Sequence, residues 1–252
     1  MEPSCAVRPA ATVMLAREEA NRVELYMLRR SSRSAFLPEV FVFPGGAVDP
    51  EDEHIARQRL LRAAQTPAPG REASDPAFEV AALREAFEEA GIFLAARRDG
   101  RSANLDGERL RGARDALLAG KTTLSELLES LDLALDARGV EHFSHWITPP
   151  TEPIRFDTHF YLAAAPRDQA ASSDDRETFA GVWISPGEAL RRYEAGNFPL
   201  IFPTIQHLRR LAAYDSIDAM QEFARTKEIR AVQPLVAGDR RFSFPEGLES
   251  RW

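Results

Sequence analysis

The sequence predicts a mixed α/β (α+β) fold, in which strands come first, a helix crosses, strands return and helices close the chain. Three observations support this prediction. Short apolar segments with turn residues between them come first, a segment with helical spacing of apolar residues follows, and strand-like segments return before the last helical ones. With 252 residues, of which 44% are hydrophobic, the chain is expected to form a single elaborated domain, 1–252, around a sizeable core.

The N-terminal part is predicted to contain three strands. Residues 10–16 and 23–28 are apolar with a polar turn between them, and residues 40–43 form the third candidate. The third strand is expected to end at the Pro-Gly-Gly run 44–46, because proline and glycine interrupt regular structure. Glycines at such a position allow the backbone to approach a phosphate or a metal ion closely.

Residues 51–74 are expected to be an insertion. A helix over 51–64 would bury three apolar residues: Ile55, Leu60 and Leu61. The run 66–70, which reads Thr-Pro-Ala-Pro-Gly, is incompatible with regular structure. The segment is therefore interpreted as an added lobe or a long loop.

The clearest helix is predicted between Asp75 and Gly91. Asp75 is a favourable N-cap, Pro76 suits the first helical position, and Gly91 can adopt the left-handed conformation that ends a helix. Apolar residues recur along it at helical spacing: Val80, Leu83, Phe87 and Ala90. We expect this stripe to pack against a core.

The remaining elements are predicted from the same patterns. Periodic leucines indicate helices over 106–118 and 124–135, within a helical insertion at 104–136. Further elements are expected in this order: strand 155–164, strand 178–184, helix 189–194, helix 203–213 and helix 216–225. The last two belong to a helical C-terminal extension, 203–252, which is left unassigned from residue 232 onward.

The composition argues against several classes of partner. The net charge is −7 and the pI about 5.4, whereas nucleic-acid binders usually carry a basic face, so no nucleic acid is expected. No apolar run is long enough to span a bilayer and the N-terminus lacks the pattern of a secretory signal, so no membrane is expected. The single cysteine, Cys5, fits a reducing compartment. A cytoplasmic protein is therefore expected.

Three carboxylates lie close together on the predicted central helix: Glu85, Glu88 and Glu89. Residues three and four apart are helix neighbours, so these charges repel one another by roughly a few tenths of a kcal/mol per pair. Arg84 can neutralise one of them, and a divalent cation such as Mg²⁺ can offset the others. A solvated acidic face is the competing interpretation. The glycine turn 44–46 directly after a strand favours a metal or phosphate site.

The run from Arg84 to Ile92 carries a specific resemblance. It reads Arg-Glu-Ala-Phe-Glu-Glu-Ala-Gly-Ile and resembles the second half of the Nudix box, the signature of the Nudix hydrolases. The first half of that box has a glycine and, six residues later, a glutamate. Gly46 fits the glycine, and Asp52, with a glutamate on each side, stands six residues on. The insertion at 51–74 then splits the box, and which acid completes its first half stays open.

The chain also resembles one branch of this superfamily, the longer, peroxisomal type of coenzyme A diphosphatase, whose box is similarly split. The resemblance extends over most of the chain through five segments: 28–38, 42–46, 155–160, 183–190 and 203–208. The signature of the short coenzyme A enzymes fits less well. Ala35 and Glu39 stand where those enzymes carry an arginine and a glycine.

The resemblance implies a fold, a reaction and a site. The fold would be an α/β/α sandwich around a mixed sheet, and the reaction would be attack of water on a diphosphate linked to another group. Four residues would hold the Mg²⁺ or Mn²⁺ on which it depends: Glu85, Glu88, Glu89 and, through its carbonyl, Gly46. Arg84 would hold the carboxylates in place. Glu177 would be a further acidic ligand or the general base, with a plain surface glutamate as the alternative.

The expected partner is a small nucleotide, with four candidate contact residues: Arg30, Arg33, Gly45 and Arg155. The favoured substrate is coenzyme A or an acyl-coenzyme A, cleaved to 3′,5′-ADP and 4′-phosphopantetheine. ADP-ribose, NADH or a modified nucleotide is one alternative, and an inactive nucleotide-binding regulator is another. A homodimer is an open possibility, by analogy with other Nudix enzymes. His142 and His145 are interpreted as core or surface histidines, because no third ligand is near them in the sequence.

Overall fold

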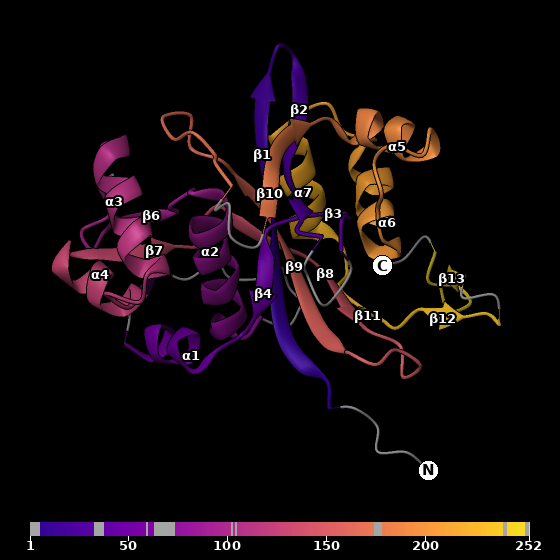
Figure 1. The fold of residues 1–252 in the computed structure, drawn as a ribbon, viewed down its shortest axis with the longest axis horizontal. Helices are drawn as coiled ribbons and strands as arrows, with labels where there is room; N and C mark the ends of the chain where they lie inside the picture. The colour runs from indigo at the N-terminus through magenta and orange to yellow at the C-terminus, as the bar shows by residue number, and fades with distance from the viewer. Residues whose placement is uncertain are drawn as a thin grey trace.

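One mixed sheet runs through the centre of the molecule (Figure 1). The computed structural model describes residues 6–32, 38–58, 60–62, 74–101, 103, 105–173, 178–238, 241–249 and 252. The strands of this sheet are β1 (Arg8–Glu19), β2 (Arg22–Arg30), β3 (Phe41–Val42), β4 (Gly45–Ala47), β8 (Val140–Ile147), β9 (Phe156–Ala164), β10 (Thr178–Ile184) and β11 (Ala231–Val232). They lie in the order β10-β2-β1-β9-β8-β11, with β3 beside β2 and β4 beside β1.

Strand β1 is the strand that joins the two halves of the sheet. It runs parallel to β9 and antiparallel to β2. It also changes its antiparallel partner along its length, because residues 16–19 pair with β2 whereas residues 10–12 pair with β4. This exchange places the glycine-containing β4 next to the N-terminal half of β1.

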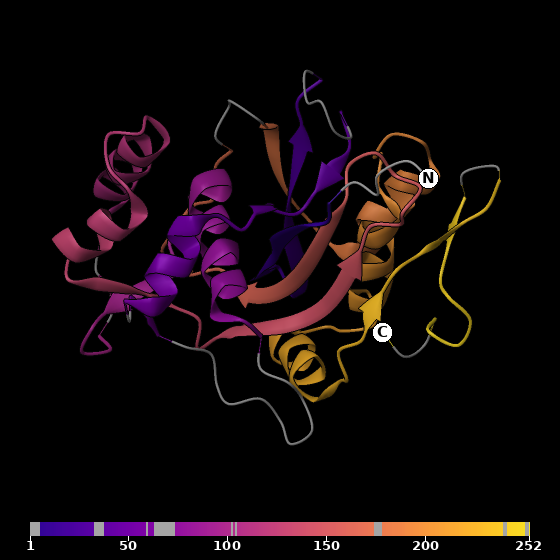
Figure 2. The ribbon, with the colours of Figure 1, turned by 90° about the horizontal axis from the view of Figure 1, so that it is seen from below.

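Helices cover both faces of the sheet, as Figures 1 and 2 show. One face carries α1 (Pro50–Arg57), α2 (Pro76–Ala90), α3 (Gly107–Leu118) and α4 (Leu124–Ser130), and the other carries α5 (Pro186–Glu194), α6 (Phe202–Leu211) and α7 (Ile217–Thr226). On β1, Val13 and Leu15 belong to the core with α2, whereas Met14 and Ala16 belong to the core with α5–α7. A strand buried on both faces needs apolar residues in both directions. The expected α/β/α sandwich around a mixed sheet is confirmed.

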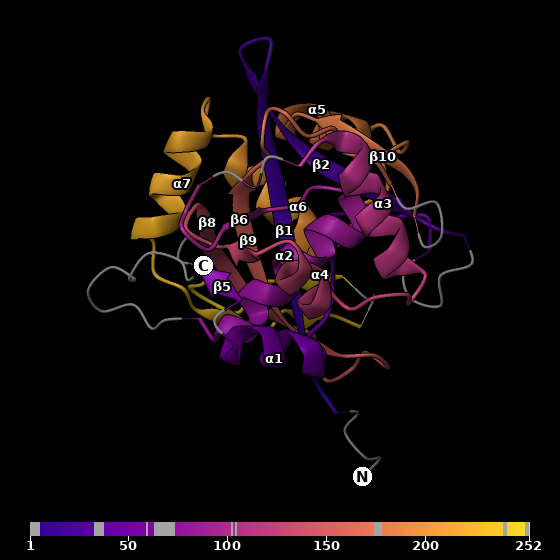
Figure 3. The ribbon, with the colours of Figure 1, turned by 90° about the vertical axis from the view of Figure 1, so that its left-hand side faces the viewer.

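A second, three-stranded sheet lies among α1, α3 and α4 (Figures 1 and 3). Its strands, in the order β5-β7-β6, are β5 (Leu61–Arg62), β6 (Ala95–Arg97) and β7 (Leu133–Asp136). The predicted helix over 51–64 ends at Arg57 and is replaced by strand at 61–62, while residues 59, 63 and 64 lie outside the described residues. The predicted helix over 124–135 is wrong beyond Ser130. Asp132 adopts a left-handed φ of 54°, and the leucines that follow are buried in the central strand of this sheet. Short apolar runs suit either a helix or a strand, and here strand pairing decides.

Two other elements differ from the sequence prediction. Strand β8 was not predicted, because its register shifts between His142 and Ser144, and this irregularity disturbs the alternation of buried and exposed residues. The extension 203–252 is helical only as far as Thr226, after which β11 and the hairpin of β12 (Leu235–Val236) and β13 (Phe242–Ser243) follow. None of the described helices combines the length and the apolar character needed to cross a bilayer. The single domain over 1–252 stays a prediction.

Candidate functional site

Helix α2 is a rigid support because both of its ends are fixed. The Asp75 side chain accepts a hydrogen bond from the backbone N–H of Ala77, and Gly91 ends the helix with a left-handed φ of 67°. The apolar stripe that the sequence indicated is fully buried: Val80, Leu83, Phe87 and Ala90. Side chains on the remaining surface of α2 are therefore held in a defined place, which a metal or catalytic site requires.

Arg84 uses all five of its N–H bonds, four toward carboxylate oxygens and one toward a backbone carbonyl. Its Nε and Nη2 donate to the two carboxylate oxygens of Asp52, at 2.9 and 3.0 Å. Its Nη1 donates to Glu85 Oε1 at 2.7 Å and to Glu88 Oε2 at 3.3 Å. Nη2 also donates to the carbonyl of Ala47 at 2.9 Å. A guanidinium has five N–H donors, so Arg84 has none left for a substrate, as expected for a residue that holds carboxylates in place.

Asp52 is the acid that α1 brings to this cluster, across the split in the box. Its side chain is 0% exposed and lies against Arg84. Burial raises the pKa of Asp52, and the hydrogen bond and the charge of Arg84 oppose that rise. The adjacent acids point elsewhere, since Glu51 accepts hydrogen bonds from Ser125 and Glu53 forms an exposed ion pair. Of the three neighbouring acids, Asp52 is therefore the one that the structure places against Arg84.

The backbone of Gly45 and Gly46 lies very close to side chains and backbone of α2 and β1. The backbone N–H of Gly45 donates to Glu89 Oε2 at 3.0 Å. A Cβ at position 46 would lie 2.1 Å from Glu85 Oε1, and one at position 45 would lie 2.5 Å from Thr12 Oγ1. A side chain at position 45 would therefore collide with the backbone of β1, and one at position 46 would displace the Glu85 carboxylate.

The charges of this cluster are unbalanced. Desolvation raises the pKa of Glu85 to about 7 and also raises the pKa of Glu88, while the charge of Arg84 opposes both shifts. Among the described residues, the Arg84 guanidinium forms ion pairs with four carboxylates: Asp49, Asp52, Glu85 and Glu88. A divalent cation would offset this excess negative charge. The donor set consists of oxygen atoms alone, which suits Mg²⁺ or Mn²⁺ better than softer cations.

A pocket of about 560 Å³ opens beside these carboxylates. Glu85 and Glu89 line its acidic end, together with the Gly45–Gly46 backbone. Its aromatic wall comes from segments far apart in the sequence: Phe43, Trp146, Phe156, Phe160, Phe202 and Phe242. Arg8 and Arg30 also line it, so the pocket offers acidic, basic and apolar surfaces side by side.

The other residues that the sequence indicated as site residues differ in their position relative to the pocket. Arg30 lines the pocket, whereas Arg155 is buried, and its Nε donates to the carbonyl of Thr148 in the pocket wall at 3.1 Å. Arg33 and Glu177 lie outside the described residues. Sequence reasoning missed Arg8. Arg8 lies on the same strand face as Ala10 and Thr12, which also line the pocket. The first predicted strand began at residue 10, and a start at residue 8 would have included Arg8.

A buried hydrogen-bond chain holds the aromatic wall. Trp146 Nε1 donates to Ser144 Oγ at 3.2 Å, and Ser144 Oγ lies 2.6 Å from His207 Nε2. His207 Nδ1 lies 2.7 Å from the carbonyl oxygen of Pro203. Because a carbonyl can only accept, Nδ1 carries the proton, and in the neutral ring Nε2 accepts from the Ser144 hydroxyl. Trp146 and Pro203 both line the pocket, so this chain connects two parts of its wall.

We predict that His207 makes the fold sensitive to acid. Desolvation lowers the pKa of His207 from 6.5 to about 3, despite the hydrogen bond to Pro203. Between these two values the unfolded state binds more protons at His207 than the folded state, so stability falls as the pH falls. From pH 7 to pH 5 the expected loss from this residue is about 2 kcal/mol. Urea unfolding of the wild type and of His207→Gln at both pH values measures this loss. Between pH 7 and pH 5 the free energy of unfolding should fall by about 2 kcal/mol less in His207→Gln than in the wild type. An equal fall in both proteins would contradict the prediction.

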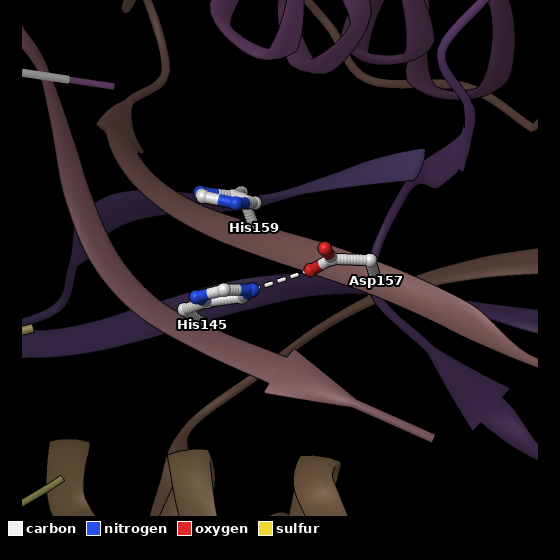
Figure 4. A group of neighbouring side chains, drawn as sticks. All are labelled: His145, Asp157 and His159. Atoms are coloured by element: carbon white, nitrogen blue, oxygen red, sulfur yellow. Dashed lines mark hydrogen bonds and ion pairs between the residues drawn. The ribbon is translucent and has the colours of Figure 1, made fainter. Parts of the chain in front are cut away.

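A second group of ionisable residues lies on β8 and β9 (Figure 4). His145 pairs with His159 across the two strands, and Asp157 forms a hydrogen bond with the Nε2 of His145. Burial and the nearby His145 lower the pKa of His159 to about 4. The sequence showed no third group beside His142 and His145, because the additional groups come from the neighbouring strand.

Comparison with known proteins identifies the family. The family model for the NUDT19 Nudix domain matches residues 65–211. The chain is similar to the acyl-coenzyme A diphosphatase NUDT19 of Gallus gallus, at 30% identity over 90% of this chain and 73% of that protein. Its identity to the acyl-coenzyme A diphosphatase NUDT19 of Homo sapiens is 26%, over 85% of this chain and 67% of that protein.

A solved structure supports the same assignment. The Nudix hydrolase from Alicyclobacillus acidocaldarius is 30% identical and superimposes with a TM-score of 0.77, covering 86% of this chain and 96% of the other. The split Nudix box, the sandwich fold and these matches agree. The chain therefore belongs to the NUDT19 branch of the Nudix hydrolases and is an enzyme of that superfamily.

Proposed function

We propose that the chain hydrolyses the diphosphate of coenzyme A or an acyl-coenzyme A, with Mg²⁺ or Mn²⁺, at the Glu85–Glu89 cluster. The observation that carries this proposal is the pocket, in which an acidic end adjoins an aromatic wall and two arginines. Coenzyme A has matching chemistry, because a diphosphate separates a phosphorylated adenosine from a longer, less polar pantetheine arm. The name of the Gallus gallus relative, an acyl-coenzyme A diphosphatase, supports the same substrate.

The reaction adds water across one P–O–P bond. That bond breaks, and the products are 3′,5′-ADP and 4′-phosphopantetheine, or its acylated form. The divalent cation would supply charge neutralisation on the phosphates and lower the pKa of the attacking water. The chain's own residues orient the site: Arg84 holds Glu85 and Glu88, and the Gly45 N–H holds Glu89. We propose Glu177 as a further ligand or as the base that accepts the proton.

Arg30 is proposed to bind the 3′-phosphate of the substrate. Arg30→Gln should raise KM for coenzyme A by roughly 10- to 100-fold, because a hydrogen bond to a charged group contributes about 1.5–3 kcal/mol. The KM for 3′-dephospho-coenzyme A should change little. Arg29→Gln is the matched control, since Arg29 is adjacent but exposed and lies 3.5 Å from Glu39. Steady-state kinetics on both substrates measures these effects. An equal rise in KM for both substrates would indicate that Arg30 contacts a part of the substrate other than the 3′-phosphate.

A substrate panel tests the proposal as a whole. Coenzyme A, an acyl-coenzyme A, ADP-ribose, NADH and a nucleoside triphosphate would be compared with Mg²⁺ and with Mn²⁺, and products followed by chromatography. Formation of 3′,5′-ADP from coenzyme A well above turnover of the others is the expected result. Preference for another diphosphate would overturn the proposed substrate, and nucleotide binding without turnover would indicate a regulator. A cytoplasmic location and a homodimer stay predictions.

A further inference from the structure

Two imidazoles and a carboxylate converge on the neighbouring strands β8 and β9. The potential ligand atoms of His145, Asp157 and His159 all lie within 4.8 Å of one another, as Figure 4 shows. Imidazole nitrogen and carboxylate oxygen together suit borderline cations such as Zn²⁺ or Co²⁺. We propose that these three residues form a second cation site, which binds a transition metal of this class.

Strand pairing produces this convergence. His145 and His159 are directly opposite each other in the antiparallel register, and Asp157 stands two residues before His159, on the same strand face. The two imidazole rings lie with their centroids 4.2 Å apart, and Asp157 forms a hydrogen bond with His145 Nε2. The three side chains are therefore neighbours because of the sheet itself, without any contribution from a loop.

This cluster is separate from the carboxylate site. On β9, Phe156, Thr158 and Phe160 line the substrate pocket, and the alternation of a strand directs Asp157 and His159 to the other face. On that face the ring of His159 lies 4.2 Å from the ring of Phe78, on the first turns of α2. The ligand types also differ, since the carboxylate site offers oxygen alone and this cluster offers two nitrogens. The two sites should therefore select different cations.

The cluster is accessible and needs only a small adjustment to bind an ion. The side chains of His145 and Asp157 are 20% and 37% exposed, so an ion can reach them and they can rotate. Bonds of roughly 2.0–2.2 Å place the ligand atoms of a tetrahedral cation about 3.4 Å apart. The ligand atoms here lie within 4.8 Å of one another, so they need to approach by at most about 1.4 Å. His142 Nε2 lies 3.1 Å from His159 Nδ1, and such a contact can orient a ligating ring through its second nitrogen.

Binding of a cation here should stabilise the folded chain. The unfolded chain does not hold these three residues together, so the ion binds the folded state preferentially and raises the melting temperature. The ion would link β8 to β9 beside the start of α2. This expectation does not depend on the identity of the substrate or on turnover.

Cobalt(II) offers a direct test, because its visible absorption changes with its ligands and its coordination geometry. The full chain would be titrated with Co²⁺ in excess Mg²⁺, which occupies oxygen sites and competes poorly for imidazole. We expect one Co²⁺ per chain, displaced by Zn²⁺, and a higher melting temperature with Zn²⁺. His159→Gln should weaken Co²⁺ binding by at least about 100-fold, and Asp157→Asn by about tenfold or more.

Two control variants separate this site from its alternatives. His54→Gln removes an exposed histidine on α1, and Glu89→Gln alters the carboxylate site, so both should bind Co²⁺ as the wild type does. Loss of binding in Glu89→Gln with binding retained in His159→Gln would assign the ion to the carboxylates and overturn the proposal. Absence of binding in excess Mg²⁺ would overturn it as well. If circular dichroism shows that His159→Gln is unfolded, Asp157→Asn tests in its place whether Co²⁺ binding depends on this cluster, because Asp157 is more exposed.

Discussion

Glu89→Gln is expected to lower kcat/KM by about 10³-fold or more and to weaken Mg²⁺ binding. The amide has nearly the same shape as the carboxylate and can still accept the hydrogen bond from Gly45 N–H, so α2 should stay intact. The substitution removes the charge proposed to hold the cation. Stabilisation of the phosphates by that cation is worth several kcal/mol, and each ~1.4 kcal/mol corresponds to a factor of ten in rate.

Steady-state kinetics over a range of Mg²⁺ concentrations, with a melting curve for each protein, measures both effects. Glu108→Gln is the matched control, because Glu108 is exposed on α3 and should leave turnover and Mg²⁺ dependence unchanged. Full activity in Glu89→Gln would remove this residue from the proposed cation site.

Arg84→Ala is expected to lower the free energy of unfolding by about 3–5 kcal/mol, and activity should be lost with it. The substitution leaves Asp52 fully buried without its positive partner, and Glu85 and Glu88 lose the donor that holds them. Urea unfolding at pH 7 measures the change. Arg57→Ala is the comparison, since the Arg57–Glu53 pair is exposed and should contribute no more than about 1 kcal/mol.

The partner substitution tests the cause of that loss. If the unpaired charge of Asp52 is responsible, adding Asp52→Ala to Arg84→Ala should restore part of the lost stability, since no buried carboxylate then lacks its counter-charge. If the two residues act independently, the loss of stability in the double variant will equal the sum of the losses in Arg84→Ala and Asp52→Ala. That result would contradict this explanation.

The central helix could be predicted from the sequence because its signals are local. Asp75 and Gly91 mark its ends through hydrogen bonds and dihedral angles within a few residues. The spacing of Glu85, Glu88 and Glu89 on consecutive turns follows from helix geometry alone. The same spacing pattern supported the resemblance to the Nudix box, which the comparisons confirmed.

The segments around this helix were harder to predict, because their conformation depends on distant partners. The leucines at 133–135 have a spacing that a helix accepts, but they pair with β5 and β6 instead. The register shift in β8 disturbs the alternation that identifies a strand. In each case a contact with another part of the chain outweighs a weak local preference.

The sequence by itself predicted the mixed α/β class and the helix that carries the glutamates, because these depend on periodicities within short segments, and its resemblance to the Nudix box indicated the family and the layered fold. Only the tertiary structure decided that Asp52 is the acid paired with Arg84, across the insertion at 51–74. It also decided which aromatic residues form the pocket wall, and it brought His145 beside His159. These contacts join residues far apart in the chain, and their positions depend on strand register and packing, which local patterns do not encode.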